Sequence, residues 1–157
     1  MCDTRLIEWQ EGFRAEGYDD ANGHDLPSGY TIVGNVTVGF GFNIGPGGGG
    51  LSEIECRLVL NYRIGKLTSK LSGLYPWYGG LDTVRKQALL SMAYNMGVPR
   101  FAGFKKMIKA FEAGNLAEAA NQVRDSLYYR NTATHNRASQ IADMIETGDW
   151  PEGFPNT

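Results

Sequence analysis

The stretch EGFRAEGYDDANG at residues 11–23, with TVGFGFN at residues 37–43, holds most of the chemically distinctive residues in the first third of the chain. Acidic side chains gather in and around it: Glu8, Glu11, Glu16, Asp19, Asp20 and Asp25. A pair of carboxyl groups can divide acid and base work on a glycosidic bond. The same carboxylates can also form a solvated face, and their spacing alone does not decide between the two interpretations.

Short elements are expected on either side of this stretch. Residues 4–10 predict one short helix that ends at a following glycine. Two β-branched runs, at residues 30–33 and 36–38, predict a hairpin around the turn Gly34-Asn35. The glycine-rich run at residues 45–50 predicts a loop.

From residue 52 onward the apolar pattern becomes helical. Ser52 and Glu55 form a capping box that opens a helix through about Leu71. Its apolar positions are Ile54, Leu58, Val59 or Tyr62, Leu67 and Leu71. Further helices are predicted after Asp82, over residues 101–113, after Asn115, and from Thr134 to Glu146. These patterns predict an α+β fold with a small αβ lobe, one long helix and a larger helical lobe.

Charge and motif spacing argue against three kinds of ligand: nucleic acid, nucleotide and metal. The formal charge is −2, with Lys+Arg 15 against Asp+Glu 17, which does not favour a nucleic-acid partner. The glycine run has P-loop spacing but puts Leu51 where a lysine must contact phosphates, so no nucleotide is expected. His24 and His135 lack partners at metal-ligand spacing, so no metal is expected.

The N-terminal residues, the apolar runs and the cysteines predict where the protein resides in the cell. The first eleven residues are not a secretory signal, and no apolar run is long enough for a membrane helix. Cys2 and Cys56 do not form a disulfide framework and are expected to be reduced thiols. We therefore expect synthesis and residence in a cytoplasm.

Three segments resemble the catalytic signature of the phage lysozymes of glycoside hydrolase family 24, the T4-type lysozymes of tailed phages. They are EGFR at residues 11–14, YDDANG at 18–23 and TVGFGFN at 37–43. The family signature has a Glu-Gly at a helix end, an Asp after eight intervening residues, and a Thr in a Thr-(Ile/Val)-Gly-x-Gly strand. Segments at residues 81–85, 92–97, 102–104, 136–138 and 147–150 match in the same order.

This resemblance covers about residues 6–150 and implies a lysozyme-like, mainly helical fold within one domain, residues 1–157. It implies a β-hairpin lobe at about 12–51 and a connecting helix at about 52–72. The helical lobe, at about 73–150, would include the N-terminal helix. The family pattern is interrupted by about a dozen extra residues, 24–35, between its Asp and Thr elements.

The resemblance also implies catalytic roles. Glu11 would be the general acid, Asp20 would orient or deprotonate the attacking water, and Thr37 would help to hold that water. Asp19 and Thr31 are the rivals; the eight-residue interval favours Asp20 and the following Val-Gly-Phe-Gly favours Thr37. In a regular strand Gly39 and Gly41 would also share the face of Thr37.

Supporting residues follow from the same comparison. Arg137 resembles an arginine that pairs with the catalytic glutamate, although a helix-surface charge is an equal alternative. Asn95 and Asn43 would contact substrate, and Tyr128 or Tyr129 would supply an aromatic platform for a sugar; these residues could equally serve packing.

The family implies a muramidase that cleaves the β-1,4 bond between N-acetylmuramic acid and N-acetylglucosamine in bacterial peptidoglycan, with inversion. Inverting enzymes separate their carboxyl groups by about 6.5–9.5 Å. The implied biology is a monomeric phage endolysin without metal or organic cofactor. It would stay in the host cytoplasm until a separate holin releases it to the cell wall. A lytic transglycosylase and a non-catalytic wall-binding module are the alternatives.

Overall fold

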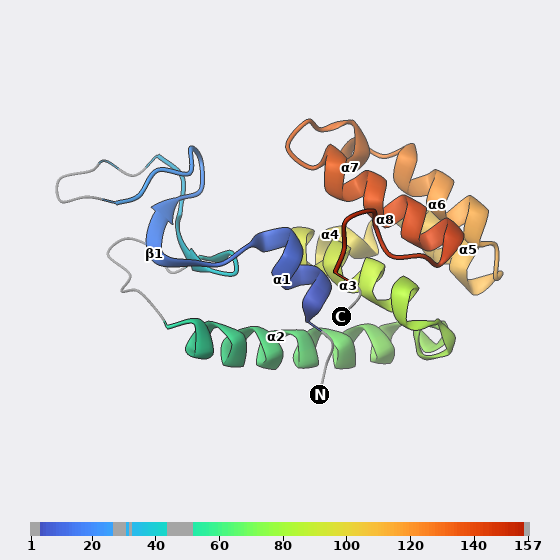
Figure 1. Cartoon of the computed structure of the whole chain (residues 1–157). Helices are drawn as coiled ribbons and strands as arrows, with labels where there is room; N and C mark the ends of the chain where they lie inside the picture. Colours follow the sequence, from blue (N-terminus) through green and yellow to red (C-terminus); the bar gives the residue numbers. More distant parts are fainter. Residues whose placement is uncertain (1–3, 27–30, 32, 44–51, 156–157) are drawn as a thin grey trace. The chain divides into compact units, whose positions relative to one another are not determined.

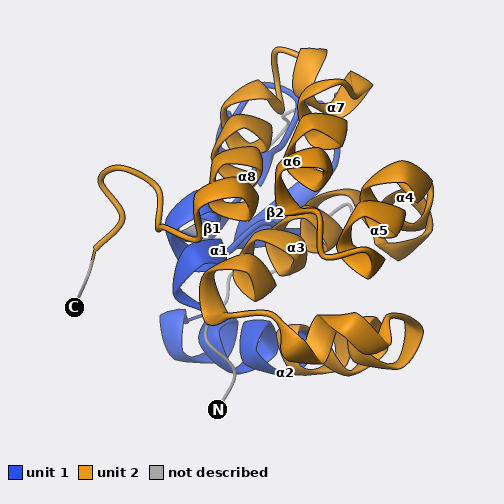
Figure 2. Ribbon diagram, turned by 90° about the vertical axis from the view of Figure 1, so that its right-hand side faces the viewer, with its two compact units in different colours: residues 1–63 blue, residues 64–157 orange. Residues whose placement is uncertain are grey.

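The computed structural model describes residues 4–26, 31, 33–43 and 52–155. The chain divides into two compact units, residues 1–63 and 64–157, which Figure 2 colours separately. Among the described residues there are eight α-helices and one small antiparallel sheet. The predicted α+β fold class is confirmed.

The first unit contains a helix and the sheet. Its elements in order are α1 (Arg5–Glu11), β1 (Arg14–Asp19), β2 (Val36–Gly39) and β3 (Phe42–Asn43), drawn in blue to cyan in Figure 1. The predicted first helix is confirmed: α1 buries Leu6 and Ile7 and ends where Gly12 adopts a φ of 65°. The three strands lie in the order β1-β2-β3.

The predicted hairpin between residues 30–33 and 36–38 is wrong. Strand β2 pairs in antiparallel fashion with β1, and the chain bends at Val33 and Gly34, so that Gly34-Asn35 is not a two-residue turn. The described residues 31 and 33 are not in a strand. The glycine-rich run at residues 45–50 lies outside the described residues.

Helix α2 (Glu53–Leu74) spans the boundary between the units as one continuous helix. The capping box is confirmed, because the Ser52 hydroxyl donates to Glu55 Oε2 at 2.6 Å and Glu55 N–H donates back to Ser52 Oγ at 3.3 Å. The helix extends three residues beyond the predicted end at Leu71.

The predicted apolar face of α2 is wrong in its first half. The described structure buries Cys56, Leu60 and Ile64 completely, together with the predicted Leu71. The expected core positions Ile54 and Leu58 are exposed instead; of the two alternatives at the next position, Tyr62 is exposed and Val59 is half-buried. Two apolar series with four-residue spacing run along this helix, and periodicity does not say which series is buried.

The second unit is helical after α2. It contains the short 3₁₀ helix η1 (Pro76–Gly80) and six α-helices: α3 (Thr83–Met96), α4 (Val98–Ala102), α5 (Lys105–Glu112), α6 (Leu116–Arg124), α7 (Leu127–Arg130) and α8 (His135–Thr147). Helix α8 packs against α3, α6 and α7.

Most of the predicted helix boundaries in this unit hold. Asp82 and Asn115 accept hydrogen bonds from backbone N–H groups at the starts of α3 and α6, as expected. The helix predicted over residues 101–113 is wrong in extent, because the chain breaks at Gly103-Phe104 between α4 and α5. Thr134 precedes α8, but its hydroxyl does not cap that helix.

One arginine ties α3 to the end of α8. Arg85 donates from Nε to the carbonyl of Ile145 at 2.7 Å and from Nη2 to the carbonyl of Glu146 at 2.9 Å. Carbonyls in the last turn of a helix lack intrahelical donors, so these bonds satisfy groups that would otherwise need water. Within the described part of the chain, no helix has the length and apolar content that a membrane span requires.

Candidate active site

Glu11 is the last residue of α1, and its carboxylate lies against the turn between β2 and β3. A β carbon built on Gly41 would stand 2.6 Å from Glu11 Oε2. Gly41 also has a φ of 71°, a conformation that favours glycine. The turn therefore approaches the half-buried carboxylate closely because position 41 has no side chain.

Tyr18 of β1 stands near both predicted catalytic carboxylates. Burial raises the pKa of its hydroxyl, and the negative charges of Glu11 and Asp20 raise it further, against the opposing effect of Arg14. The Arg14 guanidinium carbon lies 4.1 Å from the centre of the Tyr18 ring. The first unit thus brings Glu11 and Asp20 into the electrostatic neighbourhood of one phenol.

Thr37 occupies the middle of the sheet. It is directly opposite Tyr18 in β1 and Asn43 in β3. Side chains directly opposite each other in antiparallel strands share a face of the sheet. Thr37 is 5% exposed whereas Asn43 is exposed, so this face runs from a buried centre to the surface. The rival Thr31 is exposed and outside the sheet.

The two neighbouring aspartates have different environments. Asp19 is completely buried, and its carboxylate accepts backbone N–H bonds from Ala21 at 3.0 Å, Val33 at 2.6 Å and Gly34 at 2.9 Å. Asp19 therefore organises the connection between β1 and β2. Its carboxylate is committed to the backbone.

Asp20 is exposed, and Asn35 donates two hydrogen bonds to its carboxylate. Its Oδ1 accepts from the backbone N–H of Asn35 at 2.6 Å, and its Oδ2 accepts from the Asn35 side-chain amide at 3.1 Å. A β carbon at Gly34 would collide with Asp20 Oδ1 and would stand 2.8 Å from Ala21 N. The carboxylate is thus oriented from one side while it stays open to solvent.

The expected common face of Thr37, Gly39 and Gly41 is wrong. Strand β2 ends at Gly39, whose φ is 67°, and the chain then turns back into β3. A β carbon on Gly39 would stand 2.5 Å from Cys56 Sγ, whereas one on Gly41 would meet Glu11. Each glycine makes room for a different neighbour within the protein.

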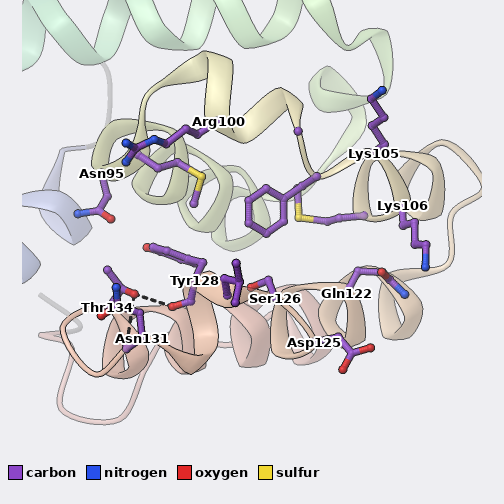
Figure 3. Close-up of a pocket in the computed structure, with 15 residues that line it drawn as sticks. Asn95, Arg100, Lys105, Lys106, Gln122, Asp125, Ser126, Tyr128, Asn131 and Thr134 are labelled. Carbon is purple, nitrogen blue, oxygen red and sulfur yellow. Dashed lines mark hydrogen bonds between the residues drawn. The ribbon is translucent and has the colours of Figure 1, made fainter.

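The second unit holds a cavity of about 910 Å³ between α4–α5 and α6–α7. Asn95 and Tyr128, two predicted substrate-binding residues, both line it. Figure 3 shows them toward one end of the cavity with Arg100, while Lys105 and Lys106 lie toward the other end. Apolar residues of the lining include Met96, Phe104, Met107 and Leu127.

A threonine fixes the backbone beneath Tyr128. The Thr134 hydroxyl donates to the carbonyl of Tyr128 at 2.5 Å, one of the dashed bonds in Figure 3. Tyr129 does not line this cavity; its ring packs edge-on against His135 with centroids 4.6 Å apart. Of the two tyrosines, only Tyr128 is placed to contact a ligand in this cavity.

The predicted site residues therefore fall into two groups. Glu11, Asp20, Thr37 and Asn43 belong to the first unit. Asn95, Tyr128, Tyr129 and Arg137 belong to the second, where Arg137 is a half-buried residue of α8. The pairing of Arg137 with Glu11 stays a prediction.

A sequence profile for the family described as "Phage lysozyme" matches residues 8–141. The chain belongs to the phage lysozyme family. The resemblance drawn from the catalytic signature is thus confirmed, and all eight predicted site residues lie inside the matched region.

Individual phage lysozyme relatives match over shorter lengths. "Probable T4-type lysozyme 1" of Dictyostelium discoideum is 38% identical over 71 residues, which are 45% of this chain and 41% of that protein. "Probable T4-type lysozyme 2" of the same organism is 37% identical over 75 residues, 48% of this chain and 43% of that protein. The "Pre-baseplate central spike protein Gp5" of Enterobacteria phage T4 is 38% identical over 74 residues, 47% of this chain and 12% of that protein. The match therefore spans less than half the length of these relatives.

Two site neighbours were not predicted from the sequence. Tyr18 and Arg14 lie within the signature segments, but no role was assigned to either. Strand pairing is the missing information: Tyr18 lies two residues before Asp20, and only the β1–β2 register places it opposite Thr37. Among the described residues, no group of histidine, cysteine, aspartate and glutamate could hold a metal ion.

Proposed function

We propose that this chain hydrolyses the β-1,4 bond between N-acetylmuramic acid and N-acetylglucosamine in bacterial peptidoglycan. The observation that carries this proposal is the arrangement around Tyr18 in a phage lysozyme family member. Glu11 and Asp20 both raise the pKa of that phenol, and Thr37 is its partner across the sheet. Hydrolysis with inversion uses two carboxyl groups, one to protonate the leaving oxygen and one to activate water. The Thr37 hydroxyl adds a group that could hold that water.

In this proposal Glu11 acts as the general acid. Its carboxyl proton passes to the glycosidic oxygen as the bond to the sugar ring breaks. The close approach of Gly41 limits the space around this carboxyl group at the end of α1. Water attacks from the opposite face of the sugar, and Asp20 orients or deprotonates that water.

Thr37 would hold the attacking water through its hydroxyl. The two Asn35 donors keep the Asp20 carboxylate aligned without shielding it from solvent. We propose that Asn43, Asn95 and Tyr128 contact the saccharide or its substituents, with Tyr129 and Arg137 in supporting positions. We also propose that this reaction uses no metal or organic cofactor.

The direct test is digestion of purified peptidoglycan followed by mass analysis of the fragments. A hydrolase yields a reducing N-acetylmuramic acid end that carries the added water. A lytic transglycosylase would yield the anhydro end, which is lighter by one water. A non-catalytic wall-binding module would yield no fragments at all.

The biological role is a further part of the proposal. We propose a phage endolysin that acts on the cell wall after a separate holin releases it from the host cytoplasm. The similarity to a phage T4 central spike protein supports a second candidate, a lysozyme carried on the phage particle. Deleting the gene separates the two, because an endolysin mutant fails to lyse from within whereas a particle-borne enzyme affects entry.

A further inference from the structure

Asp20 lies at the start of an exposed turn. The turn spans residues 20–25, and every residue in it is exposed. Two backbone hydrogen bonds close it: Gly23 N–H donates to the carbonyl of Asp19 at 2.7 Å, and Asp19 N–H donates to the carbonyl of His24 at 2.9 Å. A segment without buried side chains is the kind that opens locally. The position of Asp20 therefore depends on polar contacts made by the turn.

Arg14 supplies two of these polar contacts from β1. It is the first residue of that strand. Its Nη1 donates to the carbonyl of Gly23 at 2.9 Å, and its Nη2 forms an ion pair with Asp25 Oδ1. One guanidinium group thus binds the turn at two points, as its rigid fork of donors permits. Asn35 holds the Asp20 carboxylate itself, so Arg14 acts on a different part of the turn.

The same guanidinium group also lies over an aromatic ring. Its central carbon is 4.1 Å from the centre of the Tyr18 ring, which is within the range of a cation–π contact. Tyr18 forms a β-bridge with Asp25 and is paired with Thr37 across the sheet. Arg14 therefore connects the turn that carries Asp20 to the strand residue that is paired with Thr37.

We propose that Arg14 is a positioning residue, which fixes the place of Asp20 relative to Thr37 through its contacts with the turn and with β1. Arg14 acts through Asp20 and is assigned no contact with the sugar or the attacking water. This inference rests on the proposed function, in which Asp20 and Thr37 handle that water. A displacement of about 1 Å in a group that orients a reactant can cost on the order of 10²-fold in rate.

Folding stability gives little reason for this arrangement. The side chains of Arg14 and Asp25 are 38% and 76% exposed, and exposed ion pairs contribute little to stability because water and salt screen them. Loss of the guanidinium group should therefore leave the fold intact and loosen the turn. Activity should respond more strongly than the unfolding temperature.

An effect of charge alone is the alternative explanation. A cation near the carboxylate of Asp20 could act only through its electric field, and a lysine would then serve as well as an arginine. The contacts of Arg14 instead use two donors at a fixed separation and a flat face against the Tyr18 ring. A lysine ammonium group is a single point charge without that geometry. The variant Arg14→Lys therefore separates the two explanations.

The first test measures kcat and KM on soluble peptidoglycan chains, together with thermal unfolding. Arg14→Gln is expected to lower kcat by roughly tenfold and to change KM by less than about twofold. Arg14→Lys is expected to stay at least about threefold below the wild type in kcat. Arg124→Gln is the matched control, because Arg124 is a 31% exposed arginine that pairs with Asp143 and Glu146 in α8. Its kcat is expected to equal that of the wild type.

The second test asks whether Arg14 and Asp25 act together. Asp25→Ala removes one acceptor of the guanidinium group and is expected to lower kcat by about two- to fivefold. The double variant should be no slower than Arg14→Gln alone, because the contact is already lost in that single variant. Asp25→Ala leaves the arginine in place, so it carries the test by itself if Arg14→Gln does not fold.

The outcomes separate this inference from the function on which it rests. An unchanged kcat in Arg14→Gln or in Asp25→Ala would overturn the positioning role. So would full activity of Arg14→Lys, or losses that multiply in the double variant. A wild type that releases no fragments from peptidoglycan would overturn the proposed function, and this inference with it.

Discussion

The carboxylate of Glu11 and the backbone of Gly41 are in such close contact that a β carbon at position 41 would stand 2.6 Å from Glu11 Oε2. The two residues come from different elements, the end of α1 and the turn between β2 and β3. The glycine pattern of the signature thus has a specific structural purpose. It lets a tight turn pack directly on the proposed general acid.

Gly41→Ala should therefore lower activity more than it lowers stability. The new methyl group would push the Glu11 carboxylate away, and a displacement of about 1 Å can reduce turnover by on the order of 10²-fold. Initial rates on peptidoglycan and thermal unfolding would measure the two effects. Gly114→Ala is the matched control: its φ of 69° imposes similar backbone strain, but a β carbon there meets no described atom within 4 Å. Equal activity in the two variants would contradict the role of this contact.

Substitutions of Asp19 and Asp20 should have different effects, the first mainly on stability and the second mainly on activity. Asp20→Asn should abolish most activity and leave the unfolding temperature nearly unchanged, because this exposed carboxylate accepts hydrogen bonds from Asn35 at the surface and is not part of the buried core. Asp19→Asn should destabilise the fold by about 1–3 kcal/mol, because it weakens charge-assisted bonds to buried backbone groups. Activity assays on both variants, run below their unfolding temperatures, make the comparison. If Asp19→Asn is stable and inactive while Asp20→Asn is active, the catalytic assignment moves to Asp19.

Thr37→Val should lose activity with a stability change within about 1 kcal/mol, since valine keeps the shape of the buried side chain and removes only the hydroxyl. Thr31→Val should be close to neutral in both measurements, because Thr31 is exposed and outside the sheet. Initial rates with thermal midpoints for the two variants give the answer. An inactive Thr31→Val beside an active Thr37→Val would refute the proposed role of Thr37.

Asp82 should contribute to the loss of folding stability at acid pH. Burial raises the pKa of this carboxyl group, but the backbone N–H and guanidinium of Arg85 lower it more, so its pKa in the folded protein lies below the ordinary value. The stabilisation is therefore present above the unfolded-state pKa of about 3.9 and is lost as pH falls through the lower folded-state value.

We expect Asp82→Asn to be less stable than the wild type by about 0.5–1 kcal/mol at neutral pH, because the partly exposed ion pair is screened and asparagine still caps a helix. The difference should shrink toward zero below about pH 3. Urea unfolding at both pH values tests this, with Asp149→Asn as an exposed control. A difference that grows at low pH would contradict the sign of the pKa shift.

The sequence predicted helices well wherever caps and glycines mark their ends. Ser52, Asp82 and Asn115 each predicted the start of a helix, and in the structure a helix begins directly after each of them. The faces of α2 were not predictable in the same way, because both Leu58 and Leu60 belong to apolar series with helical spacing. Which series is buried depends on tertiary packing, which local periodicity does not encode.

The sheet was less predictable than the helices. Strand β1 contains Glu16, Gly17 and Asp19, residue types that are depleted in strands, so local propensity gives no signal for it. It forms because β2 pairs with it and because Asp19 binds the backbone of the returning chain. The family signature was therefore sufficient to predict the catalytic candidates. It did not predict Tyr18, which lies near Glu11 and Asp20 and opposite Thr37.

Digestion of purified peptidoglycan by the wild type and by Glu11→Gln tests the central claim most directly. Glutamine keeps the size of the side chain but has no proton to give to the leaving oxygen, which should cost roughly 10²–10⁴-fold in rate. We predict fragments with reducing N-acetylmuramic acid ends from the wild type and almost none from a folded Glu11→Gln variant. Anhydro ends from the wild type, or near-normal digestion by Glu11→Gln, would contradict the account.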